Sequence, residues 1–73
     1  MNADLTKKAI AANIEALDQM LADMATRVAE AYQAIEAGEQ NQAVGTILGL
    51  DQELEDALAL YRAAIALHKG GRQ

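Results

Sequence analysis

Residues 35–42 read Ile-Glu-Ala-Gly-Glu-Gln-Asn-Gln, and this stretch decides the fold because it separates two amphipathic segments. Gly38 can adopt the left-handed conformation in which many helices end. The three polar residues that follow it fit a short loop, and Asn41 is a suitable N-cap for a second helix. The stretch therefore predicts that the chain reverses here, between a helix of about residues 4–37 and a helix of about residues 42–69.

Before this reversal, apolar residues recur at alternating intervals of four and three, the heptad spacing typical of helices that pack side by side. Asp4 is the expected N-cap of this first helix, with Asn2 as the alternative. The heptad positions are Ile10, Ile14, Leu17, Leu21, Met24, Val28, Ala31 and Ile35.

After the reversal, a second apolar stripe covers about half of the helix circumference, which is wider than one partner helix can cover. Gly70 and Gly71 end this helix, and residues 70–73 are expected to form a frayed tail. The stripe follows Ile47, Leu50, Leu54, Leu58, Tyr61, Ile65 and His68, and it is widened by Ala57, Leu60, Ala64 and Leu67.

These patterns predict an all-α fold: residues 1–73 form one antiparallel two-helix hairpin with its loop at 38–41, and two copies form a four-helix bundle. A higher ring of hairpins and an obligate partner of another kind are the alternatives. The first-helix stripe and Leu54, Leu58, Tyr61 and Ile65 are expected to hold the hairpin together. The expected oligomer interface is Leu50, Ala57, Leu60, Ala64 and Leu67.

Gly45 and Gly49 lie four residues apart inside the predicted second helix. Small residues at this spacing allow two helix backbones to approach closely. The alternative is a loosely wound first turn, in which case the regular helix starts nearer Leu50 or Asp51.

Composition excludes several functions. The chain has no Cys and one His, so we expect neither a thiolate nor a histidine metal centre, and no cofactor. No nucleophile–base pair can be assembled, so an enzyme is not expected. A net charge of −5 argues against nucleic-acid binding. Because no apolar segment approaches the length of a membrane span and no signal peptide is visible, we expect a cytoplasmic protein.

Charged residues suggest three sites. Folding the chain at the loop brings Arg27 opposite Glu53, which predicts an ion pair that fixes the register. The acidic residues Asp51, Glu55 and Asp56 are candidates for contact with a basic protein surface, or they simply keep a helix face solvated. A ring of chains would instead gather the basic residues around an anionic ligand such as a nucleotide signal; these residues are Lys7, Lys8, Arg27 and Arg62.

Residues 55–70 form an Ala/Leu-rich closing helix, Glu-Asp-Ala-Leu-Ala-Leu-Tyr-Arg-Ala-Ala-Ile-Ala-Leu-His-Lys-Gly. This segment resembles the corresponding helix of phage anti-quorum-sensing hairpins, and the whole plan resembles small inhibitor proteins of phages and other mobile elements. The resemblance implies a dimeric, non-enzymatic antagonist in the host cytoplasm. The architecture is also similar to plasmid RNA-binding hairpin dimers, from which this chain departs in its excess of acid and its lack of Phe.

The function expected from the sequence is therefore a homodimeric protein-binding module, an antagonist or adaptor that binds and inhibits a host or regulatory protein. One alternative is an oligomer that sequesters a small anionic ligand, and the other is a purely structural oligomerisation element.

Overall fold

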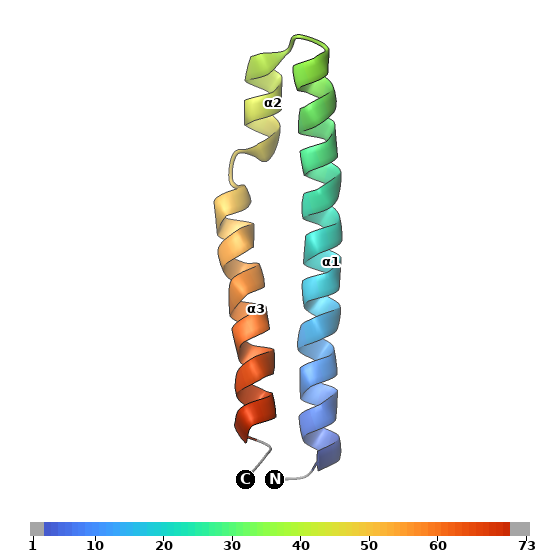
Figure 1. Cartoon of the computed structure of the whole chain (residues 1–73), viewed down its shortest axis with the longest axis vertical. Coiled ribbons are helices and arrows are strands. Elements are labelled where there is room, and N and C mark those ends of the chain that lie inside the picture. Colours follow the sequence, from blue (N-terminus) through green and yellow to red (C-terminus); the bar gives the residue numbers. More distant parts are fainter. Residues whose placement is uncertain (1–2, 71–73) are drawn as a thin grey trace.

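A computed structural model describes residues 3–70 as three α-helices: α1 (Ala3–Glu36), α2 (Gln40–Ile47) and α3 (Leu50–Gly70). The all-α prediction is confirmed for the described residues. Helix α1 runs in one direction, and α2 and α3 run back along it in a hairpin-like arrangement, with α1 contacting both (Figure 1). The molecule is long and narrow, with extents of 55 × 15 × 11 Å. We call this arrangement the helix pair.

The turn between α1 and α2 ends the first helix as predicted, on Gly38 with φ +80°. The Gly38 N–H donates to the Ile35 carbonyl at 3.0 Å, and the Glu39 N–H donates to the Ala34 carbonyl at 2.9 Å. This pair of bonds satisfies carbonyls that would otherwise lack a partner at the helix end. The turn therefore closes with backbone bonds alone.

The predicted N-caps differ from the observed ones. Helix α2 begins at Gln40, so Asn41 lies inside the helix, and the N-cap is Glu39, whose side chain makes no capping hydrogen bond. Asp4 lies in the first turn of α1 rather than before it, where its negative charge interacts favourably with the helix dipole. The alternative cap Asn2 and the tail residues 71–73 lie outside the described residues.

The predicted continuous helix over residues 42–69 is wrong at one point, because the structure divides it at Leu48 and Gly49. Leu48 is extended, with φ −63° and ψ 129°, and Gly49 has φ +94°. A helix cannot continue through these conformations, and glycine adopts the second at little steric cost. A Cβ built at Gly45 or Gly49 meets no atom within 4 Å, so neither glycine marks a close helix approach.

Helix α1 contacts α2 and α3 through a heptad pattern on each side. Buried and half-buried residues recur at intervals of three and four along both partners. Small side chains dominate where the helices are most tightly packed: Ala31, Ala34 and Ala43 form a buried cluster next to the turn. On α1 these contact positions are Ile10, Asn13, Leu17, Met20, Met24, Arg27, Ala31 and Ala34; on α2 and α3 they are Ala43, Thr46, Leu50, Glu53, Ala57, Leu60, Ala64 and Leu67.

In the second half of the chain, the residues expected to pack against the first helix and the residues expected at the oligomer interface have exchanged positions. Leu50, Ala57, Leu60, Ala64 and Leu67, expected at an oligomer interface, are buried or half-buried within the single chain. Leu54, Leu58, Tyr61 and Ile65, expected to hold the hairpin, are exposed. The physical reason is size: alanine-lined stripes let α1 and α3 approach closely, which leaves the larger side chains on an outer face.

Candidate functional site: an apolar face along the helix pair

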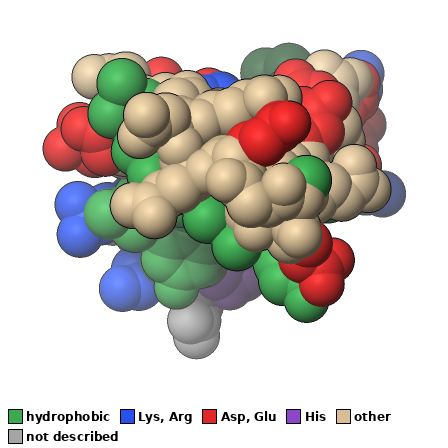
Figure 2. Space-filling model, turned by 90° about the horizontal axis from the view of Figure 1, so that it is seen from above, with side chains coloured by type: hydrophobic (Ala, Val, Ile, Leu, Met, Phe, Trp, Pro, Cys, Tyr) green, Lys and Arg blue, Asp and Glu red, His purple; other side chains and the backbone are tan. Residues whose placement is uncertain are grey.

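One long face of the helix pair is lined by large apolar side chains from both of its edges. Two adjoining shallow grooves on it are walled by α1 on one edge and by α2 and α3 on the other. In the end-on view of Figure 2, hydrophobic side chains gather on the lower side of the molecule. The large side chains are 38–63 % exposed, and they are Ile14, Leu21, Val28, Tyr32, Ile35, Val44, Ile47, Leu54, Leu58, Tyr61 and Ile65. We call this set the apolar face.

The apolar face is larger than a soluble monomer usually exposes. About half of each of its side chains is accessible, which amounts to on the order of 1,000 Å², whereas the largest apolar patch of a typical monomer is roughly 300–600 Å². The whole chain exposes 5575 Å², compared with about 4,400 Å² for a compact monomer of its mass. The excess surface is therefore of the same size as the apolar face.

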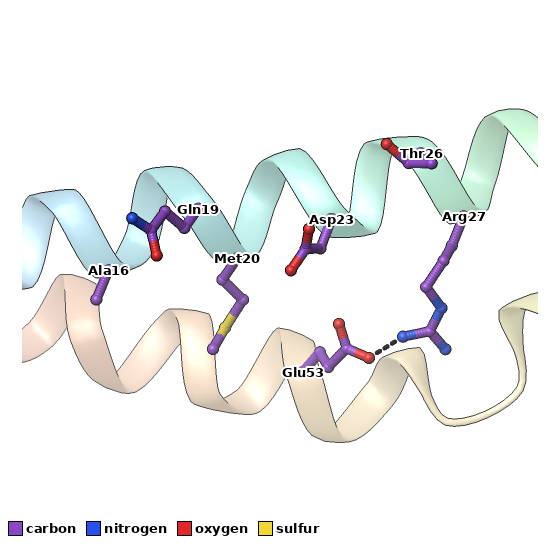
Figure 3. A pocket seen from close by; sticks show the side chains of 7 residues that line it. All are labelled: Ala16, Gln19, Met20, Asp23, Thr26, Arg27 and Glu53. Atoms are coloured by element: carbon purple, nitrogen blue, oxygen red, sulfur yellow. Dashed lines mark hydrogen bonds and ion pairs between the residues drawn. The ribbon is translucent and has the colours of Figure 1, made fainter.

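The opposite face of the pair is polar. A groove there is lined by Ala16, Gln19, Met20, Asp23, Thr26, Arg27 and Glu53. Figure 3 shows Arg27 reaching from α1 to Glu53 on α3, with the Asp23 carboxylate and the Met20 side chain beside them. A second polar groove nearer the turn contains Glu30, Gln33 and Glu39. The helix pair is therefore amphipathic as a unit, with one face suited to water and the other suited to burial.

The predicted ion pair between Arg27 and Glu53 is confirmed, and it joins α1 to the first turn of α3. Nη1 of Arg27 donates to Oε1 of Glu53, and Nη2 donates to the Leu48 carbonyl at 3.4 Å. The two side chains are 30 % and 31 % exposed, so water screens the pair in part. The second bond was not predicted, because it depends on the break at residues 48–49, which the sequence indicated only as the alternative in which the regular helix starts near Leu50.

The acidic residues Asp51, Glu55 and Asp56 are all exposed. Asp51 lies in the first turn of α3, a position at which a negative charge stabilises the start of a helix. Asp56 accepts a hydrogen bond from the Gln52 side-chain amide at 3.1 Å. The break at residues 48–49 thus gives part of the acidic run a local structural role. The carboxylates of all three residues remain exposed on the single chain.

The basic residues of the alternative ligand site do not converge within one chain. Lys7 and Arg27 are twenty residues apart on α1, which corresponds to about 30 Å along a helix. The Arg27 guanidinium already binds Glu53 and Leu48. Lys7, Lys8 and Arg62 are exposed toward the opposite end of the pair from the turn. The single chain therefore holds no preformed anion site built from these four residues.

Two negative observations apply to residues 3–70. No group of three or more His, Asp or Glu side chains is placed to hold a metal ion. No helix in this range is both long enough and apolar enough to cross a lipid bilayer.

The sequence predicted the apolar residues of both stripes but did not separate those that face α1 from those that face outward. Ala43, Ala57 and Ala64 share one seven-residue repeat with Leu50 and face α1, but the larger residues recur with the same period, so spacing alone does not distinguish the two stripes. Large residues on the neighbouring repeats are displaced to the outer face.

Comparisons of the chain with protein-family models, with curated proteins and with solved structures give no match.

Proposed function

We propose that this chain is a non-enzymatic protein-binding module that works as a homodimer: two antiparallel hairpins cover each other's apolar faces in a four-helix bundle. The observation that supports this proposal is the apolar face itself, which spans both edges of the helix pair. Two such faces in contact would bury on the order of 1,000 Å² per copy, comparable to the roughly 800 Å² per partner of a standard protein interface.

The weakness of the single-chain core supports the same proposal. Within residues 3–70, the buried apolar residues are Met24 and four alanines, Ala31, Ala34, Ala43 and Ala57. Alanine removes little apolar area from water, so these residues stabilise the pair only slightly. Small domains with cores of this kind usually need oligomerisation or another constraint to be stable.

The first experiment measures native mass by light scattering. We expect the chain to be a dimer, and we expect the double variant Leu21→Gln/Leu54→Gln to weaken dimerisation at least ~100-fold, because it places polar groups in the apolar face of both copies. The matched control is Leu48→Gln: Leu48 is 74 % exposed and lines neither groove of the apolar face, so this variant should remain a dimer. A double variant that keeps the wild-type dimer mass and affinity would refute the proposal.

The assembled dimer would leave its polar and acidic surfaces free to bind a second protein, which we propose to be a host or regulatory protein that the dimer inhibits or adapts. The inhibitory role rests on the resemblance of residues 55–70 to phage hairpins. The accessible carboxylates of Glu55 and Asp56 are the proposed contact with a basic surface on that partner. Asp51, the third member of the acidic run, lies between the apolar-face residues Ile47 and Leu54 and would be covered in the dimer.

The partner contact is tested with a tagged dimer purified from lysate. The variant Glu55→Gln/Asp56→Asn should keep the dimer mass and lose most of a protein recovered with the wild type, because it removes negative potential and preserves side-chain size. A matched variant on the other helix, Glu15→Gln/Asp18→Asn, should retain that protein. Full recovery by the Glu55→Gln/Asp56→Asn variant would contradict the assignment of these two residues. A dimer that recovers no protein would indicate a purely structural oligomerisation element.

A further inference from the structure

We infer that the two copies of the proposed homodimer lie end for end, so that the turn of one copy packs beside the α1 start and the α3 end of the other. This inference rests on the proposed homodimer, and it identifies the occupant of the apolar face as a second copy in a defined orientation. Three observations on the helix pair support it.

The first observation is the symmetry of the apolar face along the molecule. On α1, the heptad residues Ile14, Leu21, Val28 and Ile35 are symmetric about a point between residues 24 and 25. On α2 and α3, Ile47, Leu54, Leu58 and Ile65 are symmetric about residue 56.

These two midpoints lie at the same level of the pair. The ion pair places Arg27 of α1 level with Glu53 of α3. Because the two helices run in opposite directions, the point between residues 24 and 25 is then level with residues 55 and 56. A single two-fold axis perpendicular to the helices therefore relates these eight residues of the apolar face to one another, as an isologous interface requires.

Such an axis pairs apolar residues along both edges. Ile14 of one copy would lie opposite Ile35 of the second copy, and Leu21 opposite Val28. On the other edge, Ile47 would lie opposite Ile65, and Leu54 opposite Leu58.

The second observation is the position of Asp51 within α3, between two of these apolar positions and exposed. In the end-for-end arrangement it lies opposite Tyr61 of the second copy, whose hydroxyl can donate a hydrogen bond to the carboxylate. With both turns at the same end, α1 of each copy would instead pack on α3 of the other. Ala29 would then lie level with Asp51, with Val28 one residue away, and burying a carboxylate against apolar side chains is unfavourable.

The third observation is the uneven distribution of charge along the pair. Residues 25–56, which lie on the turn side of the two-fold axis, carry one basic and seven acidic residues, a formal charge of −6. Residues 3–24 and 57–70 together carry four basic and four acidic residues, a formal charge of zero. Acidic side chains are visible around the turn end in Figure 2.

This distribution disfavours the arrangement with both turns at one end. Packed helices lie about 8–10 Å apart, which is comparable to the Debye length of about 8 Å at physiological ionic strength, so repulsion between two halves of charge −6 is not fully screened. The end-for-end arrangement places each half of charge −6 beside a half with no net charge and removes most of that repulsion.

The test measures distances between spin labels in the full chain. The sequence contains no cysteine, so Glu39→Cys labels the turn alone and Lys7→Cys labels the opposite end alone. Both positions are exposed, and Glu39 makes no side-chain capping bond. Labels on Glu39→Cys in two end-for-end copies should be separated by roughly 40–45 Å, because residue 39 lies about 14–15 residues from the two-fold axis and each helical residue adds about 1.5 Å.

A mixed sample of Glu39→Cys and Lys7→Cys copies supplies the matched control, and it should give a short distance of roughly 10–25 Å, set by the helix spacing and the label tethers. A short distance between two Glu39→Cys labels, with a long distance in the mixed sample, would overturn the orientation and leave the homodimer intact. Monomer mass with no dipolar coupling in any sample would overturn the homodimer and with it this inference.

Discussion

At the scale of single residues, Arg27 links three parts of the chain: α1, the carbonyl at the end of α2 and the first turn of α3. The planar guanidinium suits this role because its N–H groups point in fixed directions toward two acceptors at once. Lysine carries the same charge but presents it as a single point. The contribution of Arg27 is therefore geometric as well as electrostatic.

We expect Arg27→Gln and Glu53→Gln each to lower the free energy of unfolding by about 1 kcal/mol, because each removes a partly exposed charge-assisted hydrogen bond. Arg27→Gln should cost more, since it also loses the bond to Leu48. The double variant should cost less than the two single losses combined, with a coupling of about 0.5–1 kcal/mol. Urea unfolding at one fixed protein concentration measures these values.

The comparison variant is Arg27→Lys, which keeps the charge and loses the two-acceptor geometry, so its stability should fall between those of wild type and Arg27→Gln. Strictly additive losses in the double variant would show that the Arg27–Glu53 contact carries no stabilising interaction of its own.

At the scale of helices, two glycines four residues apart have opposite roles. Gly45 is helical, and a Cβ there would meet open space. Gly49 has φ +94° and lies at the break between α2 and α3, where the helical conformation is interrupted. The same substitution should therefore have opposite effects at the two positions.

We expect Gly45→Ala to stabilise the chain by about 0.5–1 kcal/mol, because alanine has the higher helix propensity. Gly49→Ala should destabilise it by about 1–2 kcal/mol, because an L-residue is strained in the left-handed region. Thermal unfolding followed by circular dichroism gives both values. A stabilising Gly49→Ala would mean that α2 and α3 readily join into one straight helix.

The helix-level features show how far the sequence could predict this fold. Heptad spacing and Gly38 were sufficient for the helices and the turn, because both depend on local backbone preferences. Folding the chain at that turn also gave the Arg27–Glu53 pair. The break at Gly49 could not be separated from a helical glycine such as Gly45, because sequence shows only that glycine tolerates both conformations.

The sequence pattern also could not predict which face of α3 contacts α1. On α3, the stripe through Ala57 and Ala64 and the stripe through Leu54 and Tyr61 lie side by side on the helix surface. Periodicity defines both stripes equally well. Only packing between helices selects the alanine stripe for contact with α1, and this selection is what places the large side chains on the outer face.

At the scale of the whole molecule, the chain is extended for its length. Its radius of gyration is 16.8 Å, compared with about 11 Å for a compact domain of the same number of residues. Such a rod gains little apolar burial per residue, because at each level along its length a helix packs against only one other helix. The proposed association would give each helix a second neighbour without changing the course of either chain.

The turn between α1 and α2 has a consequence for the order in which the chain folds. It closes a loop of only a few residues, so little chain entropy is lost when the first contacts form. Helices form within about a microsecond, and the cluster of Ala31, Ala34 and Ala43 lies directly beside the turn. Pairing between the helices should therefore begin at the turn and proceed along their length. The start of α1 and the end of α3 should come into contact last and separate first.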